Sequence, residues 1–189
     1  MSNIYLYGFG GHSRVILDIL QQRQQTVAGF VSDNPPSGCP HFENIPIFSA
    51  ESLLSQLSPD ECQWIIAIGN NSIRQKIAQK LRALGHSFVA AVHPSAQIGS
   101  RVIVSPGTVI MANAVVSCDT ALGVHVIVNT GATIDHDCTI ADFCHVAPGA
   151  TVCGHVTVGA GSWLQVGTNV APCTEIAPDT VSRPGDCII

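Results

Sequence analysis

The chain has 189 residues, which is long enough for one ordinary domain or for two small ones. Only 11% of the residues are charged, and 8 basic against 13 acidic residues give a net charge of −5 without any basic run. This balance disfavours a nucleic-acid or membrane-surface partner. No apolar stretch approaches the roughly 18 residues of a membrane helix, and the N-terminus lacks the features of a signal peptide. We therefore expect a cytoplasmic protein.

Residues 1–93 are predicted to form a Rossmann-like α/β domain. Apolar runs predict strands at residues 4–7, 27–31, 64–68 and 88–92. Helical patterns follow the first and third strands, a short helix begins after Ser49, and a Pro/Gly-rich loop is expected up to about residue 47. Strands that alternate with helices predict a parallel sheet with right-handed crossovers.

A glycine-rich loop, Gly8-Phe9-Gly10-Gly11-His12, connects the first strand to the first helix. Glycines at this position let backbone amides approach a phosphate at the positive end of the helix. The third glycine of a dinucleotide fingerprint is replaced by Ser13, and the domain is small, so a mononucleotide or nucleotide-sugar fits better than NAD. A tight turn without a ligand is the alternative.

The acidic residue Asp33 follows the second predicted strand. In a parallel sheet this position lies at the same edge as the glycine loop, where a carboxylate can meet a sugar or a base. A solvated turn residue is the alternative interpretation of Asp33.

Residues 94–189 carry a six-residue repeat. Every sixth residue from Ile98 to Ile176 is aliphatic, and the residue two places before each is small or β-branched. Both kinds of residue point inward when side chains alternate along short strands, with turns after each aliphatic residue. Three hexads close one coil of 18 residues, so the repeat predicts a parallel β-helix of about five coils between residues 94 and 182.

One turn of this β-helix holds His136, two places after an inward Ile134, with Asp137 beside it. A turn exposes the imidazole at an edge of the prism, where a histidine is suited to general-base catalysis at neutral pH. The neighbouring carboxylate can orient the ring and stabilise the imidazolium. An ordinary surface histidine is the alternative.

Two further positions are candidates for ligand contacts. His145 occupies an outward strand position in the same stacked column as Ile127 and Trp163, where it can line a groove or pack between subunits. Gly154 stacks one coil above His136, where a glycine permits close approach of a thioester and its amide can hold an oxyanion. A plain turn glycine is the alternative for Gly154.

The eight cysteines contain no CxxC pair and are expected to be small buried residues rather than zinc ligands or disulfides. His125, His136, His145 and His155 are separated by 11, 9 and 10 residues. This spacing offers no close pair of the kind that holds one ion, so no metal site is expected.

Several longer motifs resemble the bacterial family of sialic-acid O-acetyltransferases and nucleotide-amino-sugar N-acetyltransferases. They are Tyr7-Gly8-x-Gly10-Gly11-His12, Ala67-Ile68-Gly69-Asn70-Asn71-x-x-Arg74, Asn129-Thr130-Gly131-Ala132-x-Ile134-Asp135-His136-Asp137-Cys138 and Asp142-Phe143-x-His145-Val146-Ala147-Pro148-Gly149-Ala150. The resemblance implies a left-handed β-helix and a homotrimer with active sites between neighbouring helices. It implies that Gly10, Gly11, His12 and Asp33 bind the nucleotide-sugar and that acetyl-CoA binds along the β-helix.

The resemblance also assigns roles to individual residues. It implies that His136 is the catalytic base and Asp137 its orienting acid, that His145 and Gly154 contact the thioester region of acetyl-CoA, and that Val166 contacts its pantetheine arm. The hexad pattern breaks at Ser182, the Gly-x-Pro-Ala stretch of the family is not found in residues 183–189, and Gln165 stands where a glycine is common.

These observations favour an N-acetyltransferase that moves acetyl from acetyl-CoA directly to the amino group of a nucleotide-linked 4-amino sugar. Two alternatives remain at this point. One is an O-acetyltransferase acting on a sialic acid or a related sugar, because a histidine base serves a hydroxyl or an amine. The other is a non-catalytic protein that binds nucleotide-sugars.

Overall fold

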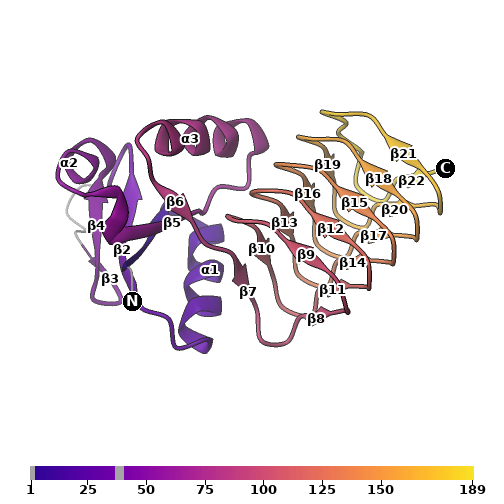
Figure 1. Ribbon diagram of the computed structural model, residues 1–189, viewed down its shortest axis with the longest axis horizontal. Coiled ribbons are helices and arrows are strands. Elements are labelled where there is room, and N and C mark those ends of the chain that lie inside the picture. The colour runs from indigo at the N-terminus through magenta and orange to yellow at the C-terminus, as the bar shows by residue number, and fades with distance from the viewer. Residues whose placement is uncertain (1–2, 37–40) are drawn as a thin grey trace. The chain divides into compact units, whose positions relative to one another are not determined.

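The computed structural model describes residues 3–36 and 41–189. These residues divide into two compact units, one ending at Val89 and the other beginning at Ala90. Figure 1 shows a mixed unit of helices and strands followed by a stack of triangular coils. The expectation of an α/β domain followed by a left-handed β-helix is confirmed.

The first unit is built on one six-stranded sheet with the order β3-β4-β2-β1-β5-β6. Its strands are β1 (Asn3–Tyr7), β2 (Val27–Ser32), β3 (His41–Phe42), β4 (Ile45–Ser49), β5 (Cys62–Ile66) and β6 (Ser87–Phe88), and its helices are α1 (Gly11–Gln22), α2 (Ala50–Leu54), α3 (Asn71–Ala83) and a 3₁₀ turn at Pro59–Glu61. All pairs are parallel except β3 with β4. The steps from β1 to β2 and from β5 to β6 run in opposite directions across the sheet, so right-handed crossovers place α1 and α3 on opposite faces.

Two local predictions for the first unit were wrong. The expected loop up to residue 47 contains β4, which pairs in parallel with β2 and sets Ile47 opposite Phe30. The expected strand at residues 88–92 is two short strands, β6 and β7 (Ala91–Val92), in different sheets. The second of them pairs with the β-helix, where Ala91 lies opposite Val109. Part of the Pro/Gly-rich loop, residues 37–40, lies outside the described residues.

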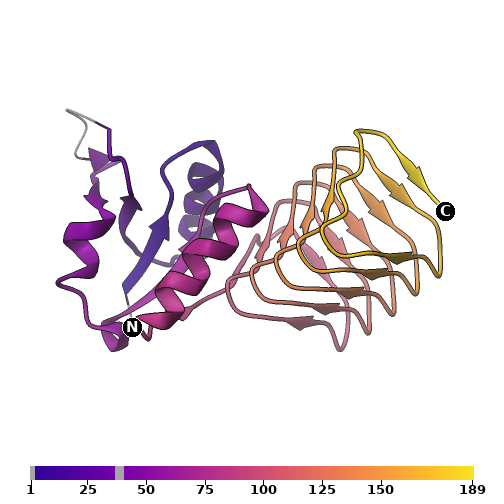
Figure 2. The same cartoon turned by 90° about the horizontal axis from the view of Figure 1, so that it is seen from above.

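The second unit is a three-sided prism of parallel two-residue strands, seen side-on in Figure 1 and from above in Figure 2. The first face contains β7, β10 (Val109–Ile110), β13 (Ile127–Val128), β16 (His145–Val146) and β19 (Trp163–Leu164). The second face contains β8 (Gln97–Ile98), β11 (Val115–Val116), β14 (Thr133–Ile134), β17 (Thr151–Val152), β20 (Asn169–Val170) and β22 (Cys187–Ile188). The third face contains β9 (Ile103–Val104), β12 (Ala121–Leu122), β15 (Thr139–Ile140), β18 (Thr157–Val158) and β21 (Glu175–Ile176).

The interior of the prism is formed by the predicted inward positions. The second residue of each central strand is buried, and the small residues two places earlier, including Cys138 and Cys144, are buried beside it. Partners are 18 residues apart, as Ile134 opposite Val116 and Val152 shows. Each corner residue therefore stacks between the residues 18 positions before and 18 positions after it in the chain.

The β-helix continues beyond Ser182, where the hexad pattern breaks. Strand β22 pairs with β20, and Val181 forms a parallel bridge with Trp163. Ser182 takes an inward position, and its hydroxyl lies 2.7 Å from Thr168 Oγ1 and accepts from the amide of Gln165. A polar residue replaces the aliphatic one here because its hydroxyl is hydrogen-bonded inside the prism.

Two expectations from composition concern the whole chain. The seven cysteines in the described part of the chain are free thiols, whereas Cys39 lies outside it. The expectation that the cysteines are buried was wrong for Cys173 and Cys187, which are exposed. None of the described helices combines the length and apolar character needed to cross a membrane.

Candidate functional site

The turn that carries His136 forms the corner between the second and third faces, where β14 ends and before β15 begins. The carboxylate of Asp135 accepts a hydrogen bond from the amide of His136 at 2.8 Å. Asp137 adopts the left-handed region with φ 56°, a conformation that Asp tolerates better than most residues. The local sequence thus places the imidazole at an edge of the prism, as predicted, with its side chain 45% exposed.

The His136 imidazole is paired with the Asp137 carboxylate, whose Oδ2 lies 2.8 Å from Nδ1. A carboxylate only accepts, so Nδ1 carries the hydrogen and Nε2 keeps its lone pair. The hydrogen bond to Asp137, together with the nearby charge of Asp135, raises the pKa of His136 above its ordinary value. The arrangement is that of an oriented imidazole with a free basic nitrogen.

Gly154 lies one coil above His136 at the same corner. A Cβ built on Gly154 would lie 2.8 Å from Cε1 and 2.9 Å from Nε2 of His136. These distances are shorter than van der Waals contact, so any side chain at residue 154 would displace the imidazole. The glycine therefore provides the space in which the ring of His136 lies.

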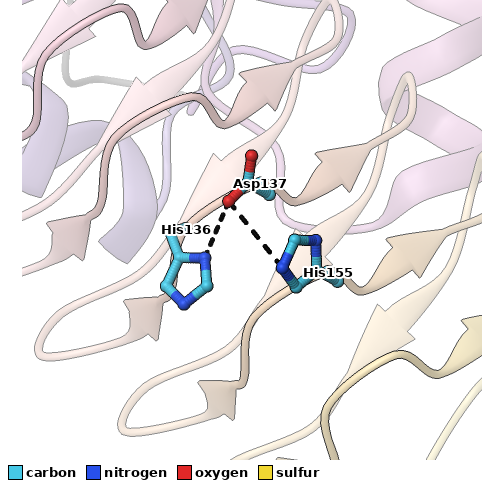
Figure 3. Close-up of side chains that lie close together, drawn as sticks. All are labelled: His136, Asp137 and His155. Carbon is cyan, nitrogen blue, oxygen red and sulfur yellow. Dashed lines mark hydrogen bonds and ion pairs between the residues drawn. The ribbon is translucent and has the colours of Figure 1, made fainter.

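His155 is a member of this cluster that the sequence did not predict (Figure 3). Its Nε2 lies 3.9 Å from Asp137 Oδ2, and its ring is nearly perpendicular to that of His136 with centroids 5.2 Å apart. The expectation that these histidines form no close pair was wrong for His136 and His155. They are 19 positions apart, which is one coil of 18 residues plus one residue, so their side chains meet at the same corner. Ligand atoms of His136, Asp137 and His155 lie within 4.8 Å of one another, so within the described chain this exposed group is the one that could hold a metal ion.

The two remaining acetyl-CoA residues lie elsewhere on the prism. His145 is on the first face, buried to 8% exposure, where its ring stacks on Trp163 and its Nε2 accepts from the side-chain amide of Asn129 at 3.0 Å. Val166 follows β19 at the corner between the first and second faces and is 55% exposed. The first face is opposite the corner that holds His136. One copy of the chain therefore does not bring the predicted acetyl-CoA residues together.

The glycine-rich loop of the first unit leaves open space at the start of α1. Gly10 is the N-cap of α1, and a Cβ built on Gly10 or Gly11 would meet nothing within 4 Å. The Ser13 hydroxyl accepts from the amide of Gly10 and donates to its carbonyl, so the serine that replaces the third fingerprint glycine braces the loop. Backbone amides at a helix N-terminus suit an anionic ligand.

His12, beside this loop, is held in its neutral form. Burial, and then the positive charge of Arg74, lower the pKa of His12 to about 4. Its Nε2 is buried without a hydrogen-bond partner among the described residues. Arg74 is itself buried and donates to the carbonyls of Ile68 and Gly69. The second motif of the first unit thus places a buried cation near enough to His12 to lower its pKa.

Asp33 follows β2 at the same sheet edge and accepts a hydrogen bond from the phenol of Tyr7 at 2.7 Å. Burial and this bond to Asp33 raise the pKa of Tyr7, so the phenol remains a donor. Tyr7 belongs to the first predicted motif, but its contact with Asp33 spans 26 positions and was not predicted. The carboxylate of Asp33 is therefore oriented by a buried partner.

The chain was compared with known proteins. The family model described as the PglD N-terminal domain matches residues 3–81. A UDP-N-acetylbacillosamine N-acetyltransferase from Bacillus subtilis is 34% identical over 116 residues, covering 59% of this chain and 52% of that protein. The chain spans about half the length of the curated relatives it matches.

Solved structures match over the whole chain. A variant of perosamine N-acetyltransferase from Caulobacter crescentus, in complex with CoA and GDP-perosamine, is 32% identical with a TM-score of 0.93, covering 100% of this chain and 89% of that one. The acetyltransferase domain of PglB from Neisseria gonorrhoeae, in complex with acetyl coenzyme A, is 30% identical with a TM-score of 0.89, covering 98% of this chain and 92% of that one.

Proposed function

Because this chain belongs to the family of hexapeptide-repeat acyltransferases that contains the nucleotide-amino-sugar N-acetyltransferases, we propose that it transfers acetyl from acetyl-CoA to a nucleotide-linked 4-amino sugar. The observation that carries the proposal is the His136–Asp137 pair, with its free basic nitrogen at an open corner of the prism. The solved relatives that hold CoA with GDP-perosamine, or acetyl coenzyme A, support both substrates. No metal is needed for this reaction.

In the proposed mechanism His136 is the general base. Nε2 accepts a proton from the sugar amine as its nitrogen attacks the thioester carbonyl carbon. The C–S bond of the tetrahedral intermediate then breaks, and the proton held by His136 passes to the departing sulfur, so the products are an amide and CoA thiol. Asp137 holds the ring and stabilises the imidazolium that forms between these two steps.

Gly154 serves this mechanism in two ways. Its missing side chain leaves room for the His136 ring, as the 2.9 Å separation from a built Cβ to Nε2 indicates. Its backbone amide is the proposed donor to the oxyanion of the tetrahedral intermediate. The first role requires that residue 154 stay a glycine, whereas the second needs only its backbone N–H.

In this proposal each part of the chain binds one substrate. Residues 1–93 bind the nucleotide-sugar, and residues 94–189 bind acetyl-CoA. Gly10 and Gly11 offer open space and backbone amides to the phosphates, and His12 is the proposed neighbouring contact. Asp33, oriented by Tyr7, would meet the sugar or base. Both substrates are metabolites of the cytoplasm, which is the location we propose.

A homotrimer is proposed because the acetyl-CoA residues are spread over the prism. His136, Asp137 and Gly154 share one corner, whereas His145 lies on the opposite face and Val166 follows another strand end. These residues can line one site only if one copy supplies the His136 corner and a neighbouring copy supplies the face of His145. A three-fold arrangement of prisms creates three such sites.

The reaction is tested with matched acceptors. CoA release from acetyl-CoA is followed with a panel of nucleotide-linked 4-amino sugars and their 4-hydroxy counterparts, and products are identified by mass. We expect one acetyl group on one amino sugar and none on its hydroxyl counterpart. Acetylation of the hydroxyl sugar would make the chain an O-acetyltransferase, and nucleotide binding without any turnover would make it a binding protein.

A further inference from the structure

We propose that His136, Asp137 and His155 form a binding site for Zn²⁺, and that the bound ion inactivates His136 as a base. The proposal rests on the proposed function in one respect, that His136 is the general base. The site is inhibitory, because the transfer of acetyl itself needs no metal. Its third ligand, His155, comes from the coil above the His136–Asp137 pair.

The coil repeat brings the three side chains to one corner of the prism. Asp137 and His155 are 18 positions apart, and both have a left-handed backbone, at φ 56° and φ 58°. The amide of His155 donates to the carbonyl of His136 at 3.0 Å, which fixes the two coils against each other at this point. The backbone therefore holds the three ligands near one another before any ion binds, which lowers the cost of binding.

The ligand atoms are close to the spacing that a zinc ion needs. Oδ2 of Asp137 lies 2.8 Å from His136 Nδ1 and 3.9 Å from His155 Nε2, and the ligand atoms of the group lie within 4.8 Å of one another (Figure 3). Ligands at about 2.0–2.1 Å from a tetrahedral Zn²⁺ are about 3.3 Å apart, so closing the group on an ion takes shifts of roughly 0.5 to 1.5 Å. Rotation of the His155 side chain, which is 59% exposed, can supply most of this movement.

The types of ligand atom determine which ion the site prefers. Two imidazole nitrogens and one carboxylate oxygen suit Zn²⁺, whereas Mg²⁺ and Ca²⁺ prefer oxygen ligands alone. Three protein ligands leave the fourth tetrahedral position to a water molecule, and all three side chains are exposed enough to admit it. The carboxylate of Asp135, on the same turn, adds negative charge beside the site. The site therefore favours zinc over magnesium.

Zinc binding removes the basic nitrogen of His136. A neutral imidazole carries one hydrogen, and in the free protein Nδ1 donates this hydrogen to Asp137. An ion on Nδ1 takes the lone pair of that nitrogen, so the hydrogen moves through solvent to Nε2. Nε2 then donates instead of accepting, and it cannot remove a proton from the sugar amine. The ion thus inhibits by fixing the wrong tautomer.

The first test measures zinc binding in the absence of substrates. The whole chain is freed of metal with EDTA, dialysed, and titrated with ZnCl₂ by isothermal titration calorimetry, with MgCl₂ as the control ion. The variant His155→Asn removes one ligand, and asparagine tolerates the left-handed backbone of this position. Cys173→Asn is the matched control, because Cys173 occupies the same corner one coil further on, with φ 60° and an exposed thiol.

We expect one tight Zn²⁺ site per chain in the wild type and in Cys173→Asn, and no binding of Mg²⁺. The zinc affinity should fall about tenfold or more in His155→Asn, because a ligand to the ion is lost. A zinc affinity that is the same in His155→Asn as in the wild type overturns the site, and so does a loss of affinity in Cys173→Asn of the same size as in His155→Asn.

The second test measures inhibition with an accepted 4-amino sugar. Initial rates, with the product detected by mass, should fall on addition of Zn²⁺ and recover with EDTA. Relative to its own metal-free rate, His155→Asn should need about ten times more Zn²⁺ for the same inhibition. Zinc that binds through His155 without lowering the rate overturns the inhibitory role. Because calorimetry needs no turnover, a chain that acetylates nothing refutes the proposed function while the zinc site is decided separately.

Discussion

In the α/β unit the candidate nucleotide site is assembled where three neighbouring strands end, whereas the β-helix assembles its candidate catalytic site by stacking coils. Gly10, Asp33 and Gly69 follow β1, β2 and β5, which are adjacent in the sheet. His136, Gly154 and His155 come together because they occupy successive coils. Topology places the first site, and the 18-residue period of the coil places the second.

The two sites also use their glycines differently. Gly10 and Gly11 have nothing within 4 Å of a built Cβ, so they leave room for a ligand. Gly154 has its built Cβ 2.8 Å from the His136 ring, so it leaves room for a catalytic group of the protein itself. Damage to the β-helix site should therefore lower kcat, and damage to the α/β site should raise the KM of the nucleotide-sugar.

The largest effect of the three substitutions below is expected for Gly154→Ala. The added methyl group must push the His136 imidazole out of position, and a displacement of about 1 Å can cost roughly 10²-fold in rate. Initial rates of CoA release should show this loss in kcat. The circular dichroism spectrum should stay unchanged because only the tip of a side chain has to move. A kcat within threefold of wild type would show that the ring does not need this space.

A smaller loss is expected for Asp137→Asn, which keeps the left-handed corner but removes the charge. The plateau rate should fall about tenfold because the imidazolium loses its partner. Asp137 raises the pKa of His136, so removing it lowers that pKa, and the acid limb of kcat/KM should move to lower pH. The matched variant Asp119→Asn, one coil below, should move the limb less. An acid limb that stays in place or moves to higher pH in Asp137→Asn would contradict the pairing.

The smallest of these effects is expected in the α/β unit, for Tyr7→Phe. The variant removes the 2.7 Å hydrogen bond to Asp33 and keeps the buried ring. The loss of one such hydrogen bond weakens binding about three- to tenfold, so the KM of the nucleotide-sugar should rise by this factor while kcat stays unchanged. Initial-rate kinetics with both substrates varied provide the measurement. A fall in kcat at constant KM would mean that Tyr7 does not act through binding.

The β-helix could be predicted from the sequence because every coil repeats the same six-residue pattern. The inward aliphatic series and the exposed corner of His136 follow directly from it, and so does the position of Gly154 above His136. His155 was missed because its separation from the other histidines was counted along the chain, whereas residues about 18 positions apart lie side by side on successive coils. Ser182 was misread because its partners, Thr168 and Gln165, are hydrogen-bonding groups that a hydrophobic pattern does not reveal.

The α/β unit was predicted in outline but not in detail. Long apolar runs predicted β1, β2 and β5. The five-residue strand β4 was missed because it contains Pro46 and lies in a Pro/Gly-rich region, which is typical of a loop. The partnership of Tyr7 with Asp33 depends on the register between β1 and β2, which sets Tyr7 opposite Val31. Register between strands is set by tertiary packing and does not follow from either strand alone.

The most direct test of the account is the rate of acetyl transfer to an accepted 4-amino sugar in His136→Ala, with Thr157→Ala, an exposed residue of β18, as the control. We expect kcat at saturating substrates to fall by about 10²-fold or more in His136→Ala, with calorimetry showing both substrates still bound, and to stay at the wild-type value in the control. A kcat in His136→Ala within a few-fold of wild type would contradict the central claim that this histidine is the base.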